Sequence, residues 1–277
     1  MLTLFRLWKL ALSRQNMHLA GRLCTFLTLL RIHIQAKLDN RPDGLIQIQF
    51  EGYTMVSYSY VTIIELYIEI FIKQAYRFET TIARPIIIDC GANMGMSLLY
   101  FKRLYPQCEV WAYEANPDAF TLLQLNVALN KLEGIHLFNY VLSDTDEEVD
   151  FYIPTTRAGL NGSLDPTIAK GMKQRLKGYR LSGLMPFNIE IDFVKIDTEG
   201  AEFNILAELS ESGRLNDIKQ YVVELHASSE NIQLQYNRLL NFFGSSYIHT
   251  SVSDQYTKGY PHVIKFCRKD LLAGPYL

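Results

Sequence analysis

The chain has 277 residues, enough for one large α/β domain or for a domain that carries an extension. Hydrophobic residues make up 48% of it and charged residues 20%, which excludes a disordered or collagen-like chain. The 27 basic and 29 acidic residues leave a formal net charge of −2, and this balance argues against a protein that clamps nucleic acid over its whole surface.

The first 38 residues differ from the rest because every charge among them is positive. No apolar run reaches the roughly 20 residues that span a bilayer, and no signal-peptide cleavage pattern follows. The segment therefore predicts a pair of basic amphipathic helices. We favour packing of these helices on the main domain or in a homodimer over contact with an anionic membrane surface. The charges are Arg6, Lys9, Arg14, Arg22, Arg31 and Lys37.

Residues 45–60 predict a β-hairpin, because polar and apolar residues alternate on either side of a turn at Glu51-Gly52. Residues 61–78 then carry apolar side chains at helical spacing. These elements and the basic helices together make an extension of residues 1–80, and residues 81–277 form the main domain.

From Pro85 onward, short apolar strands alternate with helices, the pattern of a parallel sheet covered on both faces. Strands are expected at 86–88, 109–113, 135–141, 192–196 and 220–225, and helices at 96–105, 117–130, 201–209 and 230–243. Strands at 247–252 and 262–267 complete a hairpin-like end. A short strand at 147–153 precedes a long loop that reaches Gly178. This loop holds Arg157, Lys170, Lys173, Arg175 and Lys177, which are either solvated or placed to meet an anionic acceptor.

Polar residues follow the predicted strands where ligands bind in open α/β sheets. They are Asp89, Glu114, Asp144, Asp197, Glu199, Glu224 and His226. Asn93 replaces the second glycine of a dinucleotide fingerprint, and no P-loop motif occurs, so NAD, FAD and P-loop nucleotides fit poorly. A cofactor with a ribose and a positive centre remains. Glu114 can accept hydrogen bonds from its ribose hydroxyls, and Asp89 can face its amino acid portion.

Several motifs resemble the FkbM-type branch of the class I S-adenosylmethionine-dependent methyltransferases. They are Ile88-Asp89-Cys90-Gly91-Ala92-Asn93-Met94-Gly95, Tyr113-Glu114-Ala115-Asn116-Pro117, Leu142-Ser143-Asp144, Gly162-Ser163-Leu164, and the run from Phe193 to Glu202 (FVKIDTEGAE). The resemblance implies an α/β, Rossmann-like three-layer sandwich around a seven-stranded, mostly parallel sheet whose last strand is antiparallel. It also implies S-adenosyl-L-methionine as the cofactor.

The resemblance assigns cofactor contacts along these motifs. Asp89, Gly91, Asn93 and Gly95, with Ala92 and Ser97 beside them, would line the methionine portion. Glu114 and Ala115 would hold the ribose, Asn116 would lie beside ribose and adenine, Ser143 and Asp144 would approach the adenine, and Asp197 would lie near the sulfonium.

Catalysis requires a positioned nucleophile, and a hydroxyl acceptor must also lose its proton. We expect His226 to be the general base, with Glu199 or Glu224 orienting it or the substrate and with Asp197 also in the catalytic set. We expect Lys195 to form a structural salt bridge. Two carboxylates on one loop are weak evidence for a metal site, so no metal ion is expected.

The resemblance points to O-methylation of a hydroxyl on a glycan, polyketide, peptide natural product or other secondary metabolite. N- or carboxyl-methylation and a non-catalytic cofactor-binding scaffold are the alternatives, and no nucleic-acid partner is expected. Cys24, Cys90, Cys108 and Cys267 show no metal spacing, so we interpret them as reduced, mainly buried thiols of a cytoplasmic protein.

Overall fold

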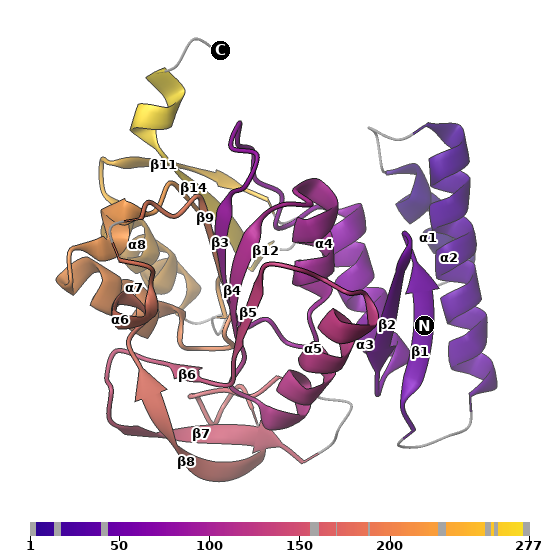
Figure 1. The fold of residues 1–277 in the computed structure, drawn as a ribbon, viewed down its shortest axis with the longest axis horizontal. Coiled ribbons are helices and arrows are strands. Elements are labelled where there is room, and N and C mark those ends of the chain that lie inside the picture. Colours follow the sequence, from indigo (N-terminus) through magenta and orange to yellow (C-terminus); the bar gives the residue numbers. More distant parts are fainter. Residues whose placement is uncertain are drawn as a thin grey trace.

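The structure, a computed structural model, describes residues 4–13, 18–39, 44–155, 161–169, 171–187, 189–226, 231–252, 256–257 and 260–273. Among these residues a seven-stranded sheet lies at the centre, with helices on both faces (Figure 1). Its strands, in spatial order, are β11 (Tyr247–Ser251), β14 (Val263–Arg268), β10 (Gln220–Glu224), β9 (Phe193–Ile196), β3 (Ile86–Cys90), β4 (Glu109–Tyr113) and β5 (Ile135–Phe138). The run from β10 to β5 is parallel, and β14 is antiparallel to β10 and β11. This confirms the predicted Rossmann-like fold and its antiparallel last strand.

The sheet is apolar on both faces because its strands carry continuous β-branched and aromatic runs, whose side chains alternate between the two sides. Ile87 and Phe193 share one buried cluster with the helices on their side, whereas Ile88 and Val194 share another with the helices opposite. The first pair of helices is α4 (Met96–Leu104) and α5 (Pro117–Leu129), and the second is α7 (Glu202–Glu211) and α8 (Ile232–Phe243). The β-strands thus hold the site-bearing loops between two rigid layers.

The first 72 residues supply α1 (Leu4–Leu12), α2 (Leu19–Leu38), β1 (Ile46–Phe50), β2 (Tyr53–Ser57), α3 (Tyr60–Leu66) and the π-helix η1 (Tyr67–Ile72). The hairpin prediction is confirmed, since Phe50 pairs with Tyr53 across the turn. The helix predicted to reach Phe78 ends earlier, at Ile72. Gln74 has a φ of 57°, a left-handed conformation that stops the helix. The chain then carries Phe78 to the sheet, where its ring stacks on Phe193 at 4.3 Å.

Asn126 on α5 joins the β1-β2 hairpin to the main domain. Asn126 is 1% exposed, and its side chain accepts a hydrogen bond from Val56 N (2.7 Å) and donates to Val56 O (3.0 Å) and Met94 O (2.9 Å). The β1-β2 hairpin is therefore fixed to the same helix that supports the glycine turn after β3.

The long loop predicted between Pro154 and Gly178 is only partly a loop. Gly171–Tyr179 forms β8, which pairs antiparallel with β7 (Glu148–Pro154) and parallel with β6 (Val141–Leu142). Lys173 Nζ lies 2.7 Å from Asp150 Oδ2 and Arg175 Nε 3.5 Å from Glu148 Oε2, so these two cations face acidic partners across the ladder. Arg157 and Lys170 lie outside the described residues.

The remaining elements are short: α6 (Leu181–Leu184), η2 (Arg214–Asp217), β12 (Tyr256–Thr257), β13 (Tyr260–Pro261) and η3 (Lys269–Ala273). In the described part of the chain, no helix has the length and apolar content needed to cross a bilayer. All four cysteines are free; Cys90 and Cys108 are buried as expected, whereas Cys24 is exposed because it lies on the outer side of α2.

Candidate active site

A cavity opens beyond the carboxyl ends of β3, β4, β9 and β10, where the strand-end residues converge. One wall consists of Gly91, Ala92 and Asn93 after β3, and Glu114 and Ala115 after β4. A second wall comes from the N-terminal segment and consists of Thr62, Glu65, Leu66, Glu69, Ile70 and Tyr76. Asp197, Thr198, Glu199 and Glu224 also line the cavity.

The glycine turn after β3 brings two backbones into close contact. A Cβ on Gly91 would lie 1.8 Å from the carbonyl oxygen of Asp197, and the residue has a φ of 84°. Only glycine fits this position, because a side chain would collide with backbone that cannot move aside. The backbone of the turn therefore lies directly beside the backbone of the loop that follows β9.

Glu114 is oriented by the backbone around it. Its Oε2 accepts from Asn93 N at 2.7 Å and its Oε1 from Asn116 N at 2.8 Å. Burial raises the pKa of Glu114 to about 7, and the two backbone hydrogen bonds oppose that rise only in part. Each carboxylate oxygen keeps a lone pair for a further donor, which fits a pair of ribose hydroxyls.

Behind the glycine turn lies a buried ion-pair network centred on Lys195. Its Nζ is 3.1 Å from Asp89 Oδ1 and 3.2 Å from Asp197 Oδ2, and it donates to Gly91 O at 2.7 Å. Burial alone would lower the pKa of Lys195, but the charges of Asp197 and Asp89 raise it overall. The predicted salt bridge is thus confirmed, and Lys195 is a fixed cation that orients both carboxylates.

Asp89 and Ser97 belong to this inner layer. Asp89 is fully buried and accepts a hydrogen bond from the Ser97 hydroxyl, while Ser97 also borders the cavity. Asp89 therefore supports the glycine turn and Lys195 from behind.

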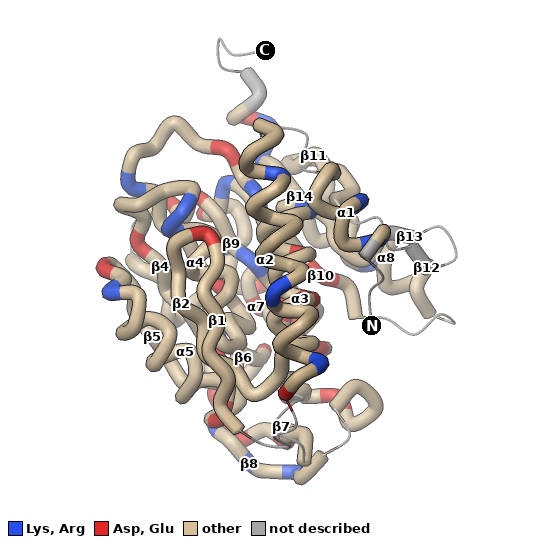
Figure 2. The backbone as a smooth tube through the Cα atoms, turned by 90° about the vertical axis from the view of Figure 1, so that its right-hand side faces the viewer, with Lys and Arg blue, Asp and Glu red and all other residues tan. Residues whose placement is uncertain are grey.

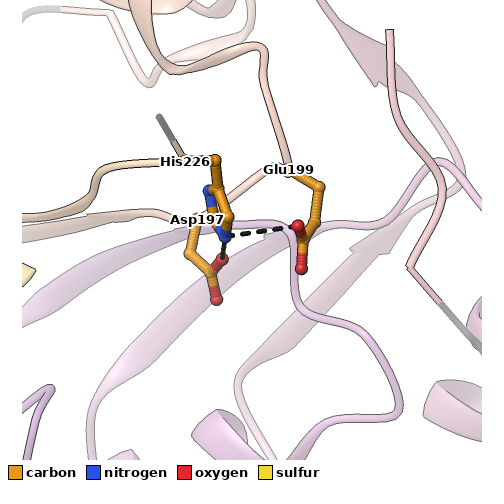
Figure 3. Close-up of side chains that lie close together, drawn as sticks. All are labelled: Asp197, Glu199 and His226. Carbon is orange, nitrogen blue, oxygen red and sulfur yellow. Dashed lines mark ion pairs between the residues drawn. The ribbon is translucent and has the colours of Figure 1, made fainter. Parts of the chain in front are cut away.

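His226, which follows β10, lies within a ring of carboxylates (Figure 3). Its Nδ1 is 3.0 Å from Glu202 Oε1, and its Nε2 is 3.2 Å from Glu199 Oε2 and 3.8 Å from Asp197 Oδ1. Glu224 Oε1 is 3.9 Å from the same Nε2. The structure thus brings together all four residues of the predicted catalytic set.

This ring controls the protonation of its members. Burial would lower the pKa of His226, but the hydrogen bond and charge of Glu202 and the charges of Glu199 and Asp197 raise it well above its ordinary value. Burial would raise the pKa of Asp197, yet the charges of Lys195 and His226 lower it overall. Burial and the charge of Asp197 raise the pKa of Glu224. The imidazolium form of His226 is accordingly favoured around neutral pH in the free protein.

Other predicted cofactor contacts lie around the cavity rather than in its wall. Gly95 has a φ of 90° and precedes α4, and the buried Asn116 caps α5 by accepting from Asp118 N. Ser143 is buried and Asp144 is exposed, one and two residues beyond the cavity-lining Leu142. Their contacts with the adenine remain predictions.

The sequence interpretation gave no role to several residues that shape the site. Glu202 closes the FVKIDTEGAE motif and is 2% exposed; it accepts hydrogen bonds from Thr198 N (3.0 Å) and Gly200 N (3.0 Å) as well as holding His226. Asn161 precedes the Gly162-Ser163-Leu164 motif and donates to Glu199 Oε1 at 2.6 Å. The available signal was membership in a motif for Glu202 and a position next to a motif for Asn161.

Tyr76 gave no such signal. Its hydroxyl donates to Asp197 Oδ2 at 2.9 Å, although 121 residues separate the two. An apolar segment before the first family motif therefore contributes a hydrogen bond to the centre of the site.

Asp197, Glu199 and His226 also satisfy the spacing of a metal site, since one ligand atom from each lies within 4.8 Å of the others. Two of these residues also have other partners: Oδ2 of Asp197 contacts Lys195, and Nδ1 of His226 contacts Glu202. The expectation of no metal ion remains a prediction.

Comparisons with known proteins agree with this geometry. The methyltransferase FkbM domain matches residues 89–251. "Methyltransferase 1" of Beauveria bassiana is 30% identical over 177 residues, covering 57% of this chain and 71% of that protein. The 31-O-demethyl-FK506 methyltransferase FkbM of Streptomyces tacrolimicus is 28% identical over 193 residues, covering 58% of this chain and 74% of that protein.

Among solved structures, M. jannaschii TYW2 in complex with AdoMet aligns with a TM-score of 0.47 and 17% identity, over 83% of this chain and 89% of that chain. Likeness at this level has no bearing on function.

The parallel sheet, the glycine turn after β3 and the carboxylate after β4 define a class I S-adenosylmethionine-dependent methyltransferase. Within that class, the chain belongs to the FkbM methyltransferase family.

Proposed function

We propose that the protein transfers a methyl group from S-adenosylmethionine to a hydroxyl of a small molecule, a sugar or another secondary metabolite. The observation that carries this proposal is the pairing of His226 with Glu202 beside Asp197 and Glu199. A hydroxyl acceptor must lose a proton during transfer, and an imidazole held by a buried carboxylate suits that task. A carboxylate acceptor needs no base and would meet carboxylate repulsion here.

When bound, S-adenosylmethionine supplies an electrophilic methyl group on a positively charged sulfur. Lys195 and Tyr76 both contact Oδ2 of Asp197, and these two contacts fix the orientation of its carboxylate in the cavity. Glu202 holds Nδ1 of His226, which leaves Nε2 facing the cavity carboxylates. To act as the base, His226 must first lose the proton that its carboxylate neighbours stabilise, and the neutral imidazole then accepts the hydroxyl proton at Nε2.

The acceptor side of the cavity supports a neutral or cationic acceptor. Leu66 and Ile70 provide apolar contact, while Glu65 and Glu69 add carboxylates to those of the strand ends. Burial and the charge of Asp197 raise the pKa of Glu69, and in the described part of the chain no hydrogen bond or ion pair joins its carboxylate to another residue. An anionic acceptor would meet these carboxylates, whose charge the nearby Lys73, Lys195 and His226 offset only in part. The name of the Streptomyces tacrolimicus relative refers to a hydroxyl oxygen as its methylation position.

We further propose that residues 1–80 act as the acceptor-recognition segment and residues 81–277 as the methyltransferase domain. The support is that the wall from Thr62 to Tyr76 and the cofactor wall line one cavity.

The test is a panel of acceptors that share one scaffold and carry a hydroxyl, an amine or a carboxylate. Release of S-adenosylhomocysteine and a product heavier by one methyl group are measured by mass spectrometry. We expect turnover with the hydroxyl form, and Glu69→Gln should improve the poor turnover of a scaffold that carries an additional carboxylate. Glu79→Gln, an exposed position outside the cavity wall, is the matched control. Turnover confined to the amine or carboxylate forms would reject methylation of a hydroxyl.

A further inference from the structure

The outer side of α2 carries an apolar stripe that the rest of the described chain leaves uncovered. Leu19, Leu23, Leu27, Ile34 and Leu38 are all exposed, with Leu19 at 73% and Leu38 at 75%. Their spacings of four and seven residues place them in one sector of the helix, since each residue advances about 100°. Leu29 and Ile32 on the opposite side are fully buried against the protein.

The neighbouring helix extends this surface. Phe5, Trp8 and Leu12 of α1 are exposed at spacings of three and four residues, while Leu7 and Ala11 face inward. Trp8 meets Phe26 of α2 edge to face at 5.2 Å, which joins the two helices. We call the exposed apolar residues of α1 and α2 the outer apolar face. Figure 2 looks onto α2 and shows that this pair of helices lies at the periphery of the molecule.

The charges on the two helices that carry the outer apolar face are all positive, and the acidic Asp39 follows the end of α2. Helices α1 and α2 contain Arg6, Lys9, Arg22, Arg31 and Lys37 and no acidic residue. On the helical wheel, Arg31 lies at one edge of the α2 stripe and Lys37 at the other. Exposed apolar side chains that extend over two neighbouring helices are typical of an interaction surface.

We propose that the outer apolar face binds an anionic lipid surface. Apolar side chains on one sector with cations at its edges are the features of a helix that lies in the membrane interface. A second copy of the chain is the poorer partner, because a two-fold contact through this face would bring only positive charges together. Neither helix is long and apolar enough to cross a bilayer, so the contact is with the membrane surface.

Vesicle co-sedimentation of the full chain tests the proposal. Vesicles of phosphatidylcholine alone are compared with vesicles that also contain phosphatidylserine, at low and high salt. We expect binding to the anionic vesicles that weakens with salt. The double variant Leu23→Gln/Leu27→Gln should lower the partition coefficient roughly tenfold or more, because two apolar side chains leave the interface. Lys9→Gln/Lys37→Gln should lower it by about the same factor.

Leu234→Gln is the matched control, since Leu234 is 71% exposed on α8, across the sheet from the N-terminal helices. All substituted positions are exposed, so unfolding temperature and cofactor binding should be unchanged. Absent binding to anionic vesicles, equal binding to both vesicle types, or binding unaffected by the Leu23/Leu27 variant would each overturn the proposal. A dimer in sedimentation velocity that the same variant dissociates, without vesicle binding, would assign the face to a second copy instead.

Discussion

Replacing Glu202 by Gln should shift the protonation of His226 without removing either side chain. Glu202 Oε1 lies 3.0 Å from His226 Nδ1, and a hydrogen bond between charged groups contributes about 1.5–3 kcal/mol. Since 1.36 kcal/mol corresponds to one pKa unit, the pKa of His226 should fall by about 1 to 2. When kcat/KM is measured from acid to alkaline pH, it rises as His226, the proposed base, loses its proton. The rising limb should therefore move to lower pH in Glu202→Gln.

The same substitution has a consequence for stability with a definite sign. The pKa of His226 is raised in the folded protein, so its contribution is fully present below the unfolded value near 6.5 and is lost as pH rises through the folded value. The difference in unfolding temperature between wild type and Glu202→Gln should therefore be largest in mildly acidic solution and smaller in alkaline solution.

Glu208→Gln is the matched control for both measurements. Glu208 lies on the same helix, is equally buried at 2% exposure, and accepts from Ser182 N at 3.0 Å, away from His226. It should leave the rising limb of the pH profile in place. His226→Ala should lower turnover roughly 10²–10⁴-fold if the histidine is the base. A limb that stays in place in Glu202→Gln, or near-normal turnover in His226→Ala, would refute the reasoning.

Two further predictions concern the cofactor wall and the ring of carboxylates. Cofactor affinity, measured by calorimetry, should weaken as pH falls below about 7, because Glu114 becomes protonated and loses acceptor capacity for the ribose; Glu114→Gln should bind more weakly and without this pH dependence. A persistent pH dependence in that variant would assign the titration to another group. Treatment with EDTA should leave turnover unchanged, because Lys195 and Glu202 already engage two members of the Asp197-Glu199-His226 group; a loss that Mg²⁺ restores would establish a metal site.

The sequence predicted the central sheet well because β3, β9 and β10 are buried on both faces and read as apolar runs with polar residues at or just after their ends. Strand β8 was missed for the opposite reason. Its residues are mostly exposed, with cations at positions 173, 175 and 177, and it pairs with β7, whose Asp150 and Glu148 lie diagonally across from Lys173 and Arg175. Pairing across strands is a tertiary property that a one-dimensional pattern does not contain.

The site was predicted where side chains follow strands and missed where distant segments meet. His226, Asp197, Glu199 and Glu224 follow two adjacent strands, so their convergence follows from the topology. The approach of Tyr76 to Asp197 depends instead on the end of the π-helix and the turn at Gln74, which no local periodicity indicates.

The division of the cavity lining between the N-terminal segment and the family domain has a consequence for how acceptor preference can change. The family match begins at residue 89, whereas the cavity-lining residues of the proposed acceptor-recognition segment end at Tyr76, so the two walls of the cavity come from separate stretches of the chain. Substitutions before residue 80 can reshape the acceptor wall while the turn around Gly91 and Glu114 stays intact. A chimera that exchanges residues 44–84 between relatives would separate the choice of acceptor from the chemistry of transfer, provided that the Tyr76 hydroxyl and its contact with Asp197 are kept.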